Sequence, residues 1–165
     1  MSRTLAGTTP GSTAGAATSG RARPGTVLQG GRAKAYRPLP ADIRRRACEN
    51  ALDAYERGDF FEAHELLEPA WMGTDDPPER DLYQGLIKLA AAFVHGVRGN
   101  PLGIANNLRG ARERLAATIG SPVAATSGLD VTVLVAAIDE RLRRLSIDPT
   151  DASMDAPRLP RSGLR

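Results

Sequence analysis

Polar side chains near the middle of the chain have the spacing of neighbours on a helix. His64 and Glu68 are four residues apart, and so are Gln84 and Lys88. Residues four apart lie one above the other on the same helix face. A carboxylate next to an imidazole can hold one tautomer, raise the basicity of the ring or share a divalent cation with it. The first pair therefore predicts a polar site whose chemistry depends on what faces it.

A second set of polar side chains can face this pair from a later helix. Gln84, Lys88 and His95 fall on one helical stripe, which an antiparallel packing of the two helices would turn toward the first pair. Trp71 can cover the site and donate its indole N–H. We therefore expect one semi-buried pocket, made by His64, Glu65, Glu68, Trp71, Gln84, Lys88 and His95.

Three interpretations of this pocket stay open. In the first, His64 and Glu68 are a polar pair that fixes helix register. In the second, the pocket binds a small molecule or a protein partner. In the third, it is a divalent-metal site with His64 and Glu68 as candidate ligands. The metal version would make the chain a metal-dependent hydrolase with Glu65 or Glu68 as the base. A zinc site needs three or four ligands, and Lys88 beside carboxylates favours an ion pair over a metal. Ligand or partner binding is the leading functional hypothesis.

Helical periodicity and helix-start signals predict the elements that position this pocket. Asp59 and Asp76 each stand three residues before a glutamate, which is typical of a capped helix start. Gly58 is placed to end the preceding helix in a left-handed conformation. The five predicted helices cover about residues 40–57, 60–71, 76–98, 100–119 and 130–145.

A weak internal repeat relates two parts of the helical region. The segments 57–70 and 98–111 align at an offset of 41 residues and share an Arg-Gly turn, a leucine and an alanine. Two helical hairpins with the same turn chemistry would produce this pattern. The predicted fold is all-α, a five-helix bundle built from two related αα-hairpins plus a C-terminal helix. Such a scaffold could instead bind a peptide or a second copy, forming a homo-oligomer through an exposed apolar groove.

The motifs of the predicted pocket also carry a family resemblance. His64, Glu68 and Trp71 have the spacing HxxxExxW within the sequence FFEAHELLE, and the run QGLIKLA begins at Gln84. These motifs resemble the bacterial and archaeal domain-of-unknown-function family number three hundred and nine over about residues 51–115. The resemblance implies a small all-helical domain whose motif has been suggested to bind metal, and it implies no established reaction. The long basic N-terminal extension is the main departure from that family's pattern.

Composition divides the chain into three parts. Residues 1–38 form a basic extension, with six basic residues and no acid through residue 40, and residues 39–147 form the helical domain. Residues 148–165 form a tail. Both ends are poor in large apolar side chains, so we expect them to be disordered.

Residue usage also limits the partners and the compartment. Cys48 is the only cysteine, which excludes an internal disulfide and favours a reducing cytoplasm. No apolar run reaches the roughly 20 residues that cross a bilayer, so we expect no membrane partner. Arginines such as Arg109 and Arg112 have no aromatic residues interleaved with them, which disfavours nucleic acid as a partner.

Overall fold

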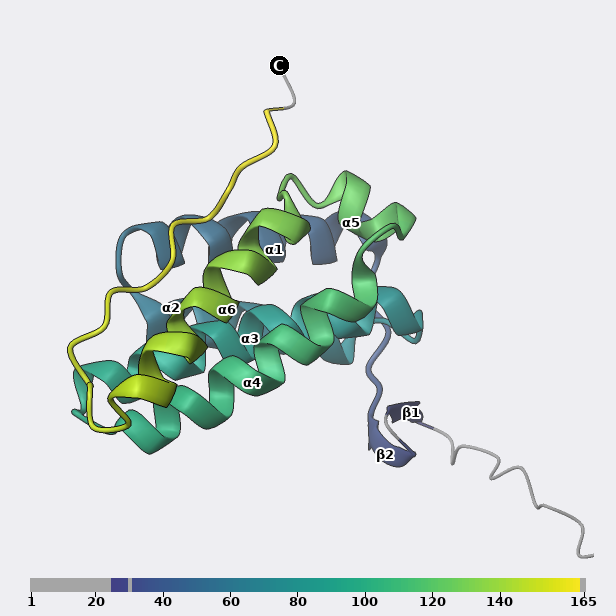
Figure 1. The fold of residues 1–165 in the computed structure, drawn as a ribbon. Coiled ribbons are helices and arrows are strands. Elements are labelled where there is room, and N and C mark those ends of the chain that lie inside the picture. Colours follow the sequence, from purple (N-terminus) through teal and green to yellow (C-terminus); the bar gives the residue numbers. More distant parts are fainter. Residues whose placement is uncertain (1–24, 30, 164–165) are drawn as a thin grey trace, which may run out of the picture.

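The computed structural model describes residues 25–29 and 31–163, and the prediction of a mainly helical chain is confirmed. A short antiparallel β-hairpin precedes the helices, and Figure 1 shows it to one side of the helical bundle. The elements are β1 (Thr26–Gln29), β2 (Arg32–Ala35), α1 (Ala41–Glu56), α2 (Phe60–Met72), α3 (Pro77–Val97), α4 (Pro101–Thr118), α5 (Pro122–Thr126) and α6 (Val131–Ile147).

Side-chain caps start most of the helices where the sequence predicts them. The carboxylates of Asp59 and Asp76 accept the backbone N–H groups three residues later, at 3.1 Å in both cases. Asn100 and Asp130 make the same bond at 3.0 Å in α4 and α6. Gly58 has a φ of +81°, which ends α1 in the left-handed region that favours glycine. These local signals explain why the five long helices match their predicted bounds to within two residues.

The hydrophobic core lies between α1, α2, α3, α4 and α6. The rings of Phe60, at the start of α2, and Phe93, near the end of α3, are 5.6 Å apart, so the two helices run antiparallel. The α3 and α4 helices pack closely because Gly85 removes a side chain from their contact. A Cβ at this position would lie 2.7 Å from Cγ of Leu115. Close packing of this kind fixes the polar side chains that α3 carries on its other faces.

Two segments outside the predicted helices have regular structure. Residues 122–126 form the short helix α5, so the expected five helices are six in the described part of the chain. Residues 26–35 were expected to be disordered and instead carry the β1–β2 pair, in which Val27 and Gln29 are buried. The rest of the expected basic extension, residues 1–24, lies outside the described residues.

The expectation of a disordered tail is wrong for residues 148–163. This segment runs back along the bundle in an extended path, the yellow trace in Figure 1. Met154 and Leu159 are buried in the core, and the Tyr55 hydroxyl donates a 3.1 Å hydrogen bond to the carbonyl of Pro157. Arg161 forms ion pairs with acidic side chains of α1. A few well-placed apolar residues therefore order a segment of low average hydrophobicity.

No helix among residues 25–29 and 31–163 is both long and apolar enough to cross a bilayer.

Candidate functional site

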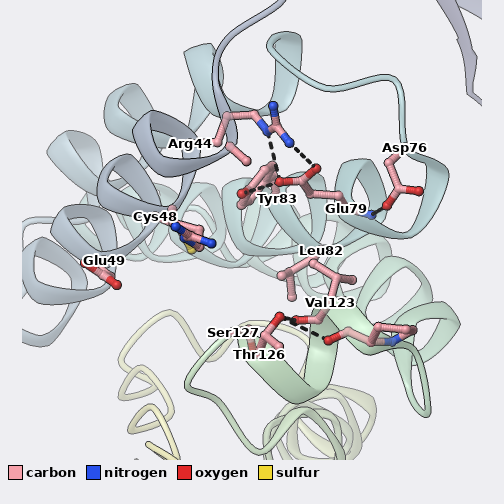
Figure 2. A pocket seen from close by; sticks show the side chains of 13 residues that line it. Arg44, Cys48, Glu49, Asp76, Glu79, Leu82, Tyr83, Val123, Thr126 and Ser127 are labelled. Atoms are coloured by element: carbon pink, nitrogen blue, oxygen red, sulfur yellow. Dashed lines mark hydrogen bonds and ion pairs between the residues drawn. The ribbon is translucent and has the colours of Figure 1, made fainter.

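A pocket of about 350 Å³ lies where α1, the start of α3 and α5 meet. Figure 2 shows Arg44, Glu79 and Tyr83 on one side of it and Val123, Thr126 and Ser127 on the opposite side. The apolar part of the lining comprises Ala41, Cys48, Leu82, Pro122 and Val123, and the rest comprises Arg44, Arg45, Glu49, Asp76, Glu79, Tyr83, Thr126 and Ser127. The volume is at the small end of the range for ligand pockets.

Glu79 is the centre of a hydrogen-bonded network in the pocket wall. One of its carboxylate oxygens accepts from Nε of Arg44 at 2.9 Å and from the Tyr83 hydroxyl at 2.8 Å. The other accepts from Nη2 of Arg44 at 2.9 Å and from the Thr74 hydroxyl at 2.7 Å. Arg44 also donates to the carbonyl of Leu39. The forked pair with Arg44 joins α1 to α3 and fixes the shape of this wall.

Glu79, Tyr83 and Cys48 in the pocket are held in their ordinary protonation states at neutral pH. Burial alone raises the pKa of Glu79, but the hydrogen bonds from Arg44, Thr74 and Tyr83 outweigh it and the pKa is lowered. Burial and the bond to Glu79 raise the pKa of Tyr83. Burial raises the pKa of Cys48 to about 12. The carboxylate is therefore charged, the phenol and thiol are protonated, and none of the three is activated for proton transfer or nucleophilic attack.

A second polar network lies beside Trp71 and joins the β-hairpin to the helices. The indole Nε1 of Trp71 donates to Oε1 of Gln29 at 3.0 Å, and the Arg80 guanidinium lies 4.8 Å from the ring centroid. Asp81 accepts from Nε2 of Gln29 at 3.2 Å and from Nη1 of Arg114 at 2.9 Å. This network connects β1, α2, α3 and α4.

Arg80 is the most buried charged side chain in this network, at 1% exposure. Its Nη1 donates to the carbonyls of Trp71 and Thr74, at 2.9 Å each, and its Nη2 lies 3.4 Å from Oε1 of Gln29. Because Thr74 also donates to Glu79, the α2–α3 turn connects the two networks. Arg80 supplies hydrogen-bond donors to two carbonyl groups at the α2–α3 turn, so its role is structural.

The predicted site residues of α2 occupy separate surroundings. His64 is half-buried, and its Nδ1 lies 3.2 Å from Oε1 of the exposed Glu65. Glu68 is half-buried and has no hydrogen bond or ion pair within the described residues. Trp71 donates its N–H as predicted, to Gln29 of the hairpin. The described hydrogen bonds and ion pairs therefore connect His64 with its chain neighbour and with none of the α3 residues.

The predicted site residues of α3 lie against α4 and the α3–α4 turn. The Lys88 side chain passes over Gly110, where a Cβ would lie 2.6 Å from the lysine Cδ. The His95 ring covers Gly103 in the same way, because a Cβ at Gly103 would lie 2.5 Å from Cγ of His95. Nδ1 of His95 is 3.2 Å from Nδ2 of Asn100. Oε1 of Gln84 is buried without a partner in the described part of the chain.

Glycines seven residues apart on α4 thus receive two side chains that are seven apart on α3. This contact explains the stripe of Lys88 and His95 as helix packing.

The described residues contain no group of three or more histidine, cysteine, aspartate or glutamate side chains placed to share a metal ion. In this part of the chain, the two predicted ligands, His64 and Glu68, therefore belong to no such group. The lining residues of the α1–α3–α5 pocket were not predicted as a site. Arg44 and Glu79 are 35 residues apart, and only the packed helices bring them together.

Comparison with known proteins gives one family. Residues 48–108 match the family described as "Domain of unknown function (DUF309)", so the family resemblance drawn from the sequence is confirmed. The matched segment extends from the second half of α1 to the middle of α4. No curated protein matches the chain. Arg44 and the α5 side of the pocket lie outside the matched residues.

Proposed function

We propose that this protein binds a small, largely apolar organic molecule in the α1–α3–α5 pocket. One observation carries the proposal: an open, mainly apolar pocket of about 350 Å³ has a wall in which Arg44, Glu79 and Tyr83 are already bonded to one another. Such a wall keeps its shape without a ligand and offers an incoming molecule chiefly apolar contact. A ligand of about 10 to 20 non-hydrogen atoms suits this volume.

Binding suits the pocket better than a reaction does. A general base or nucleophile works best with a pKa near the working pH. Burial and hydrogen bonds move the pKa values of Cys48 and Tyr83 upward and that of Glu79 downward, away from neutrality in each case. These groups supply shape and fixed charge.

The other functional hypotheses concern the predicted site residues of α2 and α3. A shared pocket of His64, Glu68 and Trp71 with the α3 side chains stays a prediction, and so does a location in the cytoplasm. The hydrolase version has less support, because His64 and Glu68 belong to no group of three or more histidine, cysteine, aspartate or glutamate side chains placed to hold a metal ion among the described residues. We also infer that α1–α2 and α3–α4 are related hairpins, since Gly58 and Gly99 both have positive φ and each is followed by a capping residue.

Binding of the aromatic dye 8-anilinonaphthalene-1-sulfonate tests the proposal. Ala41 is exposed and lines the pocket, so Ala41→Trp should obstruct the pocket without changing the core. Ala136 is an exposed helix residue outside the pocket, so Ala136→Trp is the matched control. We expect the dye to bind the unmodified chain and the control equally, and to bind the obstructed variant at least about tenfold more weakly.

Absence of dye binding would contradict the proposal. Equal binding by Ala41→Trp and the unmodified chain would also contradict it, because the dye would then occupy another surface.

A further inference from the structure

Three large apolar side chains are exposed at the end of the bundle where the α1–α2 and α3–α4 turns lie, the left end in Figure 1. Phe61, Val97 and Leu102 are 61%, 82% and 67% exposed. They belong to the first turn of α2, the last turn of α3 and the first turn of α4. We call these three residues the end patch. Exposed apolar residues gathered in one place are typical of interaction surfaces, whereas single ones are not.

A hollow of about 270 Å³ adjoins the end patch. Phe61 and Val97 line it, together with Gly58, Asp59, Phe60, Val94 and Arg98. The floor is therefore apolar, and both turns contribute to the rim. The same end of the protein thus presents both projecting apolar side chains and a recess that can receive one.

The internal repeat relates two of the three residues of the end patch. At the offset of 41 residues, Phe61 corresponds to Leu102, so both hairpins place a large apolar residue at the second position of their second helix. The positions are not needed for the core, because neither side chain is buried. The exposure of this position in both hairpins indicates a surface that takes part in an interaction.

We propose that the end patch is the contact surface of a symmetric dimer, with a second copy of this chain as the partner. In a two-fold symmetric interface, each copy contributes the same surface. That surface must therefore carry both the projecting side chains and the hollow that receives them, and the end patch with its adjoining hollow does so. Charge supports the same partner. Asp59 and Arg98 line the hollow together, and Arg98 has no ion pair within the described residues. A two-fold axis can bring Arg98 of each copy to Asp59 of the other.

The size of the end patch sets the expected strength. Three apolar side chains per copy cover less than the roughly 800 Å² per partner of a standard interface. We therefore expect a reversible dimer with a dissociation constant between roughly 10 µM and 500 µM. This inference is independent of the α1–α3–α5 pocket, which lies at the opposite ends of α1 and α3.

Sedimentation equilibrium of the full chain over roughly 10 µM to 1 mM tests the proposal. We expect a mass that rises from monomer toward dimer. Leu102→Glu should raise the dissociation constant at least about tenfold, because it places a charge in the apolar contact. Val133→Glu is the matched control, since Val133 is 51% exposed in the first turn of α6, outside the end patch. Circular dichroism checks that both variants are folded.

A second variant tests the charge pairing. Asp59→Asn keeps a good cap for α2 and removes the carboxylate, so dimerisation should weaken by about two- to fivefold and lose part of its salt dependence. A monomer at every concentration would overturn the proposal, whatever other partner the end patch then bound. A dimer that Leu102→Glu leaves unchanged, or that the control weakens as much, would overturn it as well.

Discussion

Replacing the carboxylate at the centre of the pocket wall should cost a calculable part of the stability. Glu79→Gln preserves the shape of the side chain but leaves one oxygen where two now accept four hydrogen bonds. Two donors then face an NH₂ group that cannot accept from them. At about 1.5 kcal/mol for each bond to a charged acceptor, the free energy of unfolding should fall by roughly 3 kcal/mol, or about 10 °C in melting temperature.

The pH dependence of this loss gives the sharper test. The pKa of Glu79 is lowered in the folded chain, so its stabilisation is fully present above its ordinary value of 4.5 and is lost as the pH falls through the lower folded value. Urea unfolding at about pH 7 and about pH 3 should therefore show a large difference between Glu79→Gln and the unmodified chain at the first pH and a smaller one at the second.

Glu113→Gln is the matched control. Glu113 lies on α4, is exposed to solvent and has no hydrogen-bond or ion-pair partner among the described residues. It should change the free energy of unfolding by less than about 0.5 kcal/mol. A loss below about 1 kcal/mol for Glu79→Gln, or a loss of equal size at both pH values, would refute the account of the wall.

Four further changes test other contacts. Gly85→Ala should cost roughly 2 kcal/mol in urea unfolding because its Cβ would lie 2.7 Å from Leu115, whereas Gly96→Ala, with 3.7 Å of clearance, should gain up to about 1 kcal/mol. Truncation after Ile147 removes buried tail residues and should cost at least about 3 kcal/mol, and an unchanged thermal midpoint would contradict the packed tail. Gln29→Leu should loosen the hairpin and shift the emission of the lone tryptophan to longer wavelength; an unshifted spectrum would argue against that contact.

Local sequence signals predicted the helices well because the groups involved are neighbours in the chain. Asp59 and Asp76 each cap a helix through an amide three residues away. The tail was missed because its order depends on distant partners: Tyr55 and Pro157 are 102 residues apart. Average hydrophobicity carries no information about such a contact.

The same distinction explains the outcome for the candidate site. The sequence predicted that Trp71 would donate its N–H, but the acceptor, Gln29, is 42 residues away on a hairpin that was expected to be disordered. The sequence shows the stripe of Lys88 and His95, and it also shows Gly103 and Gly110, the glycines that these side chains contact. Their common spacing of seven residues could have indicated helix packing before any pocket was considered.

Methyl NMR with a set of small aromatic and aliphatic fragments tests the central claim most directly. The binding account predicts that at least one fragment shifts the methyl resonances of Leu82 and Val123, which line the α1–α3–α5 pocket, and leaves those of Val133 and Ile147 unchanged. Fragments that shift no pocket methyl, or whose effects centre instead on the methyl groups of Leu66 and Leu67, which lie between His64 and Glu68 in the sequence, would contradict it.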